Sequence, residues 1–233
     1  MVLGLSMVKE KKANTFISAG NTGVQMATST LLLGRIPHVK RPALSVFFPA
    51  LTGGKILCDV GANPDVSASH LLQFAIMSSV YLDHVEGIKN PKIGLINIGE
   101  EPSKGSELYQ KSYSLLEKEL PNFIGNVEGR DVLDGDVDVL VADGFTGNVI
   151  LKTLEGTVQF LVNQIISALS TDDAAEVGPQ ALGHLAPIAA ELNPDAVGGA
   201  MLLGVNGVAI ISHGSAGPTA IVNACKVAQD MVE

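Results

Sequence analysis

The sequence predicts an α/β fold with a mainly parallel sheet flanked by helices. Short apolar runs recur along the chain, and they end in glycine, asparagine or aspartate before segments of helical period. Strands that alternate with helices in this way are typical of parallel sheets covered on both faces. With 46% hydrophobic and 17% charged residues, the 233-residue chain has enough apolar side chains for a substantial core.

The expected strands, in chain order, are 14–19, 43–49, 55–60, 92–98, 122–127, 137–143 and 207–213. Helices are expected to begin near Thr22, Ala68, Ser106, Asn148 and Pro218. Pro179 and Pro187 should limit any helix within 170–196 to short pieces, so this stretch is expected to protrude. We therefore interpret the chain as one α/β domain, residues 1–233, with a helical excursion at about 164–196.

Composition restricts the classes of protein to consider. The net charge is −9, aromatic residues make up 4% and tryptophan is absent, which disfavours a nucleic-acid-binding surface. The sequence has no apolar stretch that reads as a signal peptide or a bilayer span, which favours the cytoplasm. Cys58 and Cys225 are far apart and the histidines are not clustered, so neither a metal site nor a disulfide framework is predicted.

Polar, glycine-rich segments lie at the ends of six predicted strands. In α/β folds the carboxyl ends of strands bind ligands, because exposed N–H groups at helix N-termini attract anions. Glycine permits close approach to a ligand, and asparagine and threonine add neutral donors. One such loop is commonly only a turn, but six at corresponding strand ends predict a site for a phosphate-sized anion. The segments are SAGNTG (18–23), DVGAN (59–63), NIGEE (97–101), GNVEG (125–129), DGFTGN (143–148) and HGS (213–215).

The common nucleotide and hydrolase motifs do not occur in these loops. None matches GxGxxG followed by an acidic residue, none matches GxxxxGK[ST], and the chain has no GxSxG. The predicted phosphate is therefore not expected to belong to NAD or ATP.

These ordered motifs, together with NFIGNVEGRD (122–131) and GGAMLLGVNGVAIISHGS (198–215), resemble the bacterial phosphate acyltransferase family PlsX. The resemblance covers the whole chain and is weakest over 164–196. It implies a three-layer α/β/α fold like that of isocitrate and isopropylmalate dehydrogenases, a homodimer and no cofactor. The implied reaction transfers a fatty acyl group from acyl carrier protein to inorganic phosphate. A glycerol-3-phosphate acyltransferase partner would then use the acyl phosphate in phospholipid synthesis.

This chemistry needs positioning more than it needs a strong nucleophile. Phosphate is already an oxyanion at neutral pH, and a thiolate whose conjugate acid has a pKa of about 8.5 leaves without strong acid assistance. The enzyme must hold phosphate in line with the thioester carbonyl and donate hydrogen bonds to the developing oxyanion.

The candidate site residues follow from this requirement. Lys152 is expected to face either phosphate or solvent, and His213 is either a proton carrier or phosphate ligand or a buried structural histidine. His213, Asn148 and Asn21 are the candidates for catalysis. Asp59, Asn63 and Asp143 are expected to position the loops. The anion cradle and oxyanion donors are expected to be Gly20, Asn21, Thr22, Gly23, Thr146, Gly147 and Asn148.

A basic segment is the candidate docking site for acyl carrier protein, which is acidic. Arg35, His38, Lys40 and Arg41 concentrate positive charge in GRIPHVKRPA. The alternative is an ordinary charged connector.

The sequence also departs from the pattern of the family. Family members usually begin further upstream with a DAMGGD motif, so activity of this exact chain is open. Ser67, Ser69 and Ile211 stand where charged residues are common. The excursion carries Asp172, Asp173, Glu176, Glu191 and Asp195 without a basic residue, which predicts weak peripheral membrane contact at most.

Two alternative functions remain. One is a phosphotransacetylase-like enzyme for short acyl-CoA, and the other is an inactive scaffold that binds carrier protein.

Overall fold

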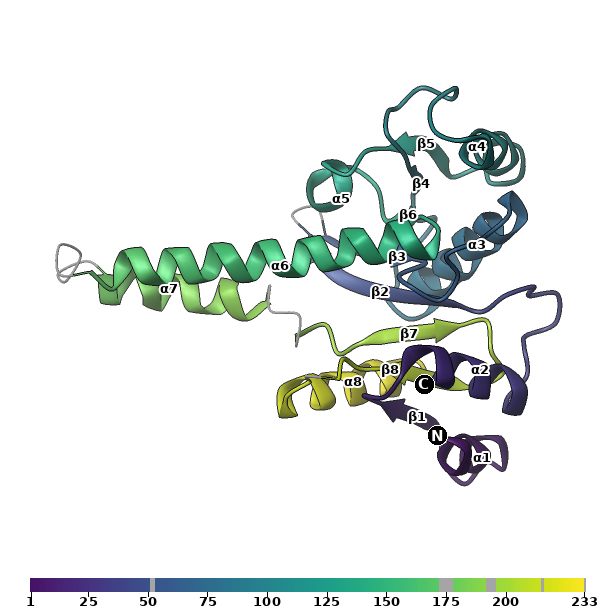
Figure 1. Cartoon of the computed structure of the whole chain (residues 1–233), viewed down its shortest axis with the longest axis horizontal. Helices are drawn as coiled ribbons and strands as arrows, with labels where there is room; N and C mark the ends of the chain where they lie inside the picture. Colours follow the sequence, from purple (N-terminus) through teal and green to yellow (C-terminus); the bar gives the residue numbers. More distant parts are fainter. Residues whose placement is uncertain (51–52, 172–177, 192–195, 215, 233) are drawn as a thin grey trace.

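The computed structural model describes residues 1–50, 53–171, 178–191, 196–214 and 216–232 (Figure 1). All seven expected strands are present, whereas α1, α5 and β7 were not expected and α6 begins at Gly144 rather than Asn148. In chain order the elements are α1 (Val2–Lys9), β1 (Thr15–Ser18), α2 (Thr22–Leu32), β2 (Ala43–Ala50), β3 (Gly53–Cys58), α3 (Ala68–His84), β4 (Ile93–Ile96), α4 (Glu107–Glu119), β5 (Phe123–Val127), α5 (Asp131–Asp134), β6 (Val139–Val141), α6 (Gly144–Leu169), α7 (Gly178–Glu191), β7 (Ala200–Leu203), β8 (Val208–Ile211) and α8 (Pro218–Asp230).

The strands of the described chain form one mixed sheet in the order β1-β8-β7-β2-β3-β6-β4-β5. Parallel pairs lie towards both ends, but β8-β7, β7-β2 and β2-β3 are antiparallel. Consequently β1 and β8 run one way, and β3, β4, β5 and β6 run the other. The expectation that all six polar loops lie at corresponding strand ends is therefore wrong, because the two sets of carboxyl ends are on opposite edges.

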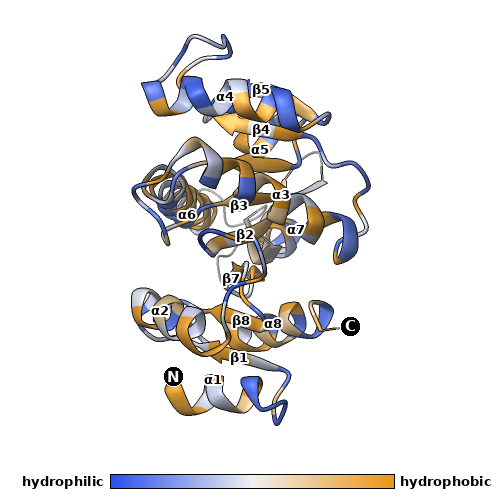
Figure 2. Ribbon diagram, turned by 90° about the vertical axis from the view of Figure 1, so that its right-hand side faces the viewer, coloured by the Kyte–Doolittle hydropathy of each residue, from blue (hydrophilic) through white to orange (hydrophobic). Residues whose placement is uncertain are grey.

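Each face of the sheet has its own core. In β2, Leu44, Val46 and Phe48 belong to one apolar cluster, while Ala43 and Phe47 pack in the other. This alternation is the period of two expected of a strand buried on both faces. Helices α1, α2, α5 and α6 pack on the first face, and α3, α4 and α8 pack on the second. Figure 2 shows the apolar strands between these two layers of helices, as expected of a three-layer α/β/α fold.

The excursion is a pair of packed helices that projects from the sheet (Figure 1). Helix α6 continues to Leu169, and α7 packs beside it with Pro187 inside the helix. The expectation that Pro187 would restrict this region to short pieces is therefore wrong, since α7 spans 14 residues. Proline removes one hydrogen bond of a helix, and packing against a long neighbour can compensate for that loss. The acidic residues Asp172, Asp173, Glu176 and Asp195, and the side chain of Glu191, lie outside the described part.

Candidate functional site

A cleft of about 1030 Å³ lies over β2, between the halves of the sheet. Leu44, Val46 and Phe48 form its floor, and residues from α2, α6 and the segments after β1, β3 and β8 form its walls. Four of the six polar segments therefore meet in one place, although their strands point in opposite directions. The glycines and polar residues that they contribute are Gly20, Asn21, Thr22, Gly23, Gly61, Gly144, Asn148, His213 and Gly214, and Ser212 lines the cleft just before the last segment.

Helix α2 presents its N-terminus to the cleft. The Asn21 side chain caps the helix by accepting a hydrogen bond from the Val24 N–H at 3.0 Å. Thr22 and Gly23 lie in the first turn and line the cleft. N–H groups in the first turn of a helix have no intrahelical acceptor, and the helix dipole adds partial positive charge. This end of the cleft is therefore suited to an anion.

The segment after β3 is organised by the buried Asp59 carboxylate. Its oxygens accept hydrogen bonds from the N–H groups of Gly61, Ala62 and Asn63 at 3.1, 2.9 and 2.8 Å. The Asn63 side chain donates to Asp59 at 2.7 Å and to the Pro42 carbonyl oxygen at 2.8 Å. Burial raises the pKa of Asp59, and these hydrogen bonds oppose that rise. Asp59 and Asn63 thus hold the wall of the cleft and do not line it themselves.

The segment DGFTGN (143–148) leads from the end of β6 into the start of α6. Asp143 is the N-cap: its carboxylate accepts from the Thr146 N–H at 2.8 Å, from the Thr146 hydroxyl at 2.9 Å and from the Tyr109 hydroxyl at 2.5 Å. Burial and the neighbouring Asp143 raise the pKa of Tyr109 to about 12. Gly147 packs directly on the Asp59 carbonyl, and its own N–H donates to the Asp143 carbonyl oxygen. Thr146 and Gly147 were predicted to cradle the anion, but the structure uses both to build and seat the helix.

Helix α6 presents one continuous face to the cleft beyond this start. Asn148, Lys152, Glu155 and Gln159 lie on that face at helical spacing, beside Leu151, Leu154 and Val158. Lys152 Nζ lies 2.7 Å from Glu155 Oε2. Polar and apolar residues therefore alternate along the part of α6 that lines the cleft.

His213 is exposed and lines the cleft, so the alternative of a buried structural histidine is wrong. Lys152 also faces the cleft, with 44% of its side chain exposed. Positive charge is therefore available in the cleft, although Lys152 is paired with a carboxylate.

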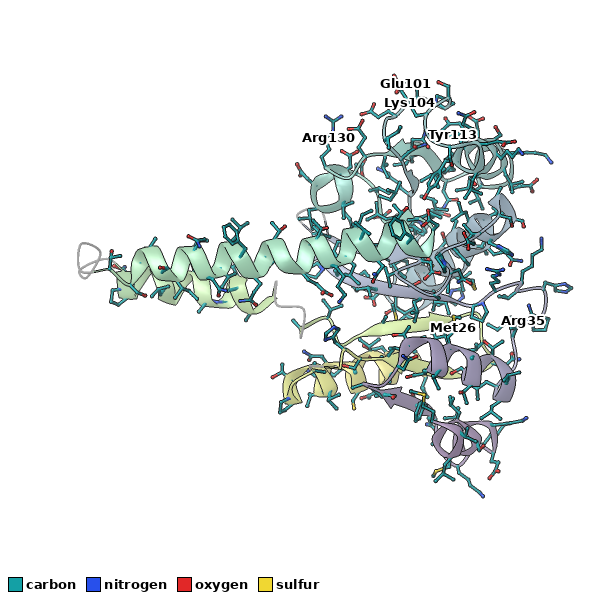
Figure 3. The ribbon with its side chains drawn as sticks, in the orientation of Figure 1. Met26, Arg35, Glu101, Lys104, Tyr113 and Arg130 are labelled. Carbon is teal, nitrogen blue, oxygen red and sulfur yellow. The ribbon has the colours of Figure 1, made fainter. Side chains whose placement is uncertain are left out.

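Two predicted polar segments do not reach the cleft. Residues 97–101 and 125–129 lie near β4 and β5, where Asn126 donates to the Glu101 carbonyl oxygen at 2.8 Å. Figure 3 shows Glu101 and Lys104 on an outer loop at the far end of the sheet, and Arg35 elsewhere on the surface.

Sequence patterns missed several parts of the cleft. Phe48 and Pro49 line it from β2 and were predicted only as part of the strand 43–49, and Leu133 lines it from α5 and was not singled out. Tyr109 had no signal, because it reaches Asp143 from a helix 34 residues away. Glu155 could have been found from its spacing, since it lies seven residues after Asn148 on a helix whose face was already implicated.

Comparisons with known proteins identify the family of the chain. The family model described as fatty acid synthesis protein matches residues 1–233. A phosphate acyltransferase of Halothermothrix orenii is 48% identical over all of this chain and 70% of its own length. A phosphate acyltransferase of an Exiguobacterium species is 44% identical over all of this chain and 71% of its own length. The chain thus spans about 70% of the length of these relatives.

Solved structures support the fold. A branched-chain phosphotransacylase from Enterococcus faecalis V583 matches all of this chain and 78% of its own, with a TM-score of 0.68 and 13% identity. EutD phosphotransacetylase from Staphylococcus aureus matches all of this chain and 67% of its own, with a TM-score of 0.64 and 16% identity. Among the described residues, no helix has both the length and the apolar character needed to cross a membrane. The family match over every residue and the identity to curated members show that the chain belongs to the fatty acid synthesis protein family, the family of the phosphate acyltransferases.

Proposed function

We propose that this phosphate acyltransferase moves a fatty acyl group from the thioester of acyl carrier protein to inorganic phosphate. The observation that carries the proposal is the mixed lining of the cleft. The first turns of α2 and α6, with Asn21, Asn148 and His213, line the same cleft as apolar side chains of β2, α5 and α6. One cleft thus offers an anion site beside a surface for an alkyl chain.

The reaction proceeds by direct displacement. A phosphate oxygen attacks the thioester carbonyl, the new C–O bond forms, and the carbonyl oxygen becomes an oxyanion. The C–S bond then breaks, and the carrier thiolate takes a proton from water. N–H groups of Thr22 and Gly23, with the amides of Asn21 and Asn148, orient phosphate and stabilise the oxyanion, while Lys152 and His213 add attraction for phosphate. No step requires a metal or redox group.

The apolar part of the cleft receives the acyl chain. Val46 and Phe48 form the floor of this part, and its sides are lined by Leu133, Leu154 and Val158. Burial of each methylene contributes about 0.8 kcal/mol, so a long chain gains much more from this surface than an acetyl group does. The geometry therefore favours fatty acyl donors over acetyl-CoA.

The decisive assay is formation of acyl phosphate from palmitoyl carrier protein and inorganic phosphate, detected by trapping the product with hydroxylamine. We expect the rate to rise with phosphate and to fall as the acyl donor is shortened from palmitoyl to acetyl. Faster turnover of acetyl-CoA would establish the phosphotransacetylase alternative. Binding of carrier protein without any acyl phosphate would establish the scaffold alternative.

We place carrier-protein docking on the exposed segment around Arg35, Lys40 and Arg41. The Arg41 guanidinium donates to the Asp65 carbonyl oxygen at 2.8 Å, Arg35 donates to the Lys40 carbonyl oxygen, and Lys40 Nζ donates to the Ser69 hydroxyl at 3.0 Å. These partners are neutral, so they order the side chains without cancelling their charge. Burial lowers the pKa of nearby His70, and Arg41 and Lys40 lower it further. The segment therefore forms an ordered cationic surface suited to an acidic carrier.

Arg35→Glu should raise the KM for acyl carrier protein about tenfold and leave the KM for an acyl-CoA donor within twofold, because only the carrier reaches this surface. Steady-state kinetics with both donors measures this difference. Lys226→Glu is the matched charge reversal, at an exposed lysine of α8. An equal change for both donors would remove the docking assignment.

The helical excursion is our candidate dimer surface. On α6, Phe160, Leu161, Ile165 and Ile166 expose between 42% and 60% of their surface, and such a row of apolar side chains is typical of a protein interface. Phe160→Glu combined with Ile165→Glu should convert a dimer to a monomer in sedimentation velocity. A wild-type chain that sediments as a monomer would contradict this assignment.

A further inference from the structure

The cleft pairs its lysine with a carboxylate, which is unexpected for an anion site. Lys152, Glu155 and His213 are the ionisable side chains among the described residues that line it. Lys152 Nζ lies 2.7 Å from Glu155 Oε2, and 44% and 29% of these side chains are exposed. The opposite charges of Lys152 and Glu155 cancel each other within the cleft. A phosphate dianion would bind more tightly if Glu155 were uncharged. The presence of the Glu155 carboxylate in the cleft therefore needs an explanation.

The positions on α6 allow Lys152 to exchange partners. Asn148 precedes Lys152 by one turn, towards the helix N-terminus, whereas Glu155 follows it by nearly one turn. A lysine side chain has a flexible four-carbon stem and three donors. Its ammonium can therefore turn towards a bound anion near Asn148 or back to Glu155.

Magnitudes favour exchange over permanent pairing. A partly exposed ion pair changes an equilibrium constant by about fivefold at most. The repulsion between a carboxylate and a dianion within the same cleft is of similar or greater size, since the cleft is less polar than bulk water. Phosphate can therefore displace Glu155 from Lys152, and the displaced carboxylate then weakens phosphate binding.

We infer that Glu155 is a positioning residue that competes with phosphate for Lys152, and that it thereby speeds release of the anionic acyl phosphate. The inference rests on the proposed function, because it assumes that phosphate binds beside Lys152. It assigns to Glu155 control of affinity and product release, without contact between Glu155 and the reacting atoms.

The test compares Glu155→Gln with wild type by calorimetric titration of inorganic phosphate and by steady-state kinetics. Glu155→Gln should lower both the Kd and the KM for phosphate three- to tenfold and strengthen inhibition by acetyl phosphate to the same extent. The kcat should fall, because product leaves more slowly. Glu155→Asp keeps the charge and should remain within twofold of wild type in all of these constants.

A double-mutant cycle separates competition from a general structural effect. With Lys152→Met as the background, Glu155→Gln should change the phosphate Kd by a smaller factor than it does in wild type. Glu107→Gln is the matched control, because it breaks a 2.6 Å exposed pair with Lys111 on the distant helix α4. That variant should leave every phosphate constant unchanged.

Each outcome decides between the two claims. If wild type forms acyl phosphate but Glu155→Gln leaves the phosphate Kd unchanged or raises it, the inference fails and the proposed function stands. If wild type binds phosphate without acyl transfer, the proposed function fails and the titration still decides whether Glu155 competes. If wild type binds no phosphate, both fail.

Discussion

Replacing Gly147 by alanine should destabilise the fold by about 3 kcal/mol and abolish phosphate binding. A Cβ at this position would lie 1.9 Å from the Asp59 carbonyl oxygen and 3.0 Å from its carbonyl carbon. Neither atom can rotate away, because the Asp59 carboxylate fixes the surrounding segment through several N–H groups. The start of α6 must instead move outwards, and Asn148 moves with it. Urea denaturation and phosphate titration measure the two effects.

The matched control lies on the same helix. Gly156 is exposed, and a Cβ there would meet no atom within 4 Å. Gly156→Ala should therefore stabilise the protein by up to about 1 kcal/mol, because alanine has the higher helix propensity. Equal unfolding free energies for wild type and Gly147→Ala would show that the close contact between α6 and Asp59 is not required.

Asn148→Asp should reduce kcat/KM for phosphate at least 100-fold while the protein remains folded. The two side chains have nearly the same shape, but the change replaces an amide donor with a carboxylate that faces the bound anion. Loss of one oxyanion donor typically costs about 10²- to 10³-fold in rate, and charge repulsion adds to this cost. Initial rates over a phosphate series measure the effect, and thermal unfolding verifies the fold.

Asn163→Asp makes the same chemical change at an exposed position further along α6. Asn163 does not line the cleft, so this variant should retain wild-type kinetics. Asn148→Ala should also be impaired, but less so than Asn148→Asp, because it removes the donor without adding charge. A fully active Asn148→Asp would exclude Asn148 from the anion site.

Hydropathy predicted where the strands lie but not how they are directed. The runs that became β1 to β6 and β8 were all recognisable, whereas β7 lies in the same apolar stretch as β8 and was not separated from it. Gly199 and Gly204, with φ of +106° and +91°, flank β7, and the chain reverses into the antiparallel β8 after Gly204. A period of two looks the same in either direction, so the antiparallel centre of the sheet could not be predicted.

The candidate site was predicted in part for a related reason. Glycine and asparagine mark a place where backbone approaches something closely, but the sequence does not say whether that is a ligand or another segment. At Asn21 and Asn148 the space beside the residue is the cleft, whereas at Gly147 it is filled by Asp59. Long-range partners such as Tyr109 and Asp143 leave no local pattern at all.

Strand β2 serves two purposes that evolution cannot adjust separately. Val46 and Phe48 floor the cleft, and the same strand joins the halves of the sheet by pairing with β3 and β7. A smaller side chain at either position would lengthen the space for an alkyl tail. It would also weaken the packing of the strand that joins the two halves of the sheet. Changes in chain-length preference should therefore be accompanied by compensating substitutions in the neighbouring strands.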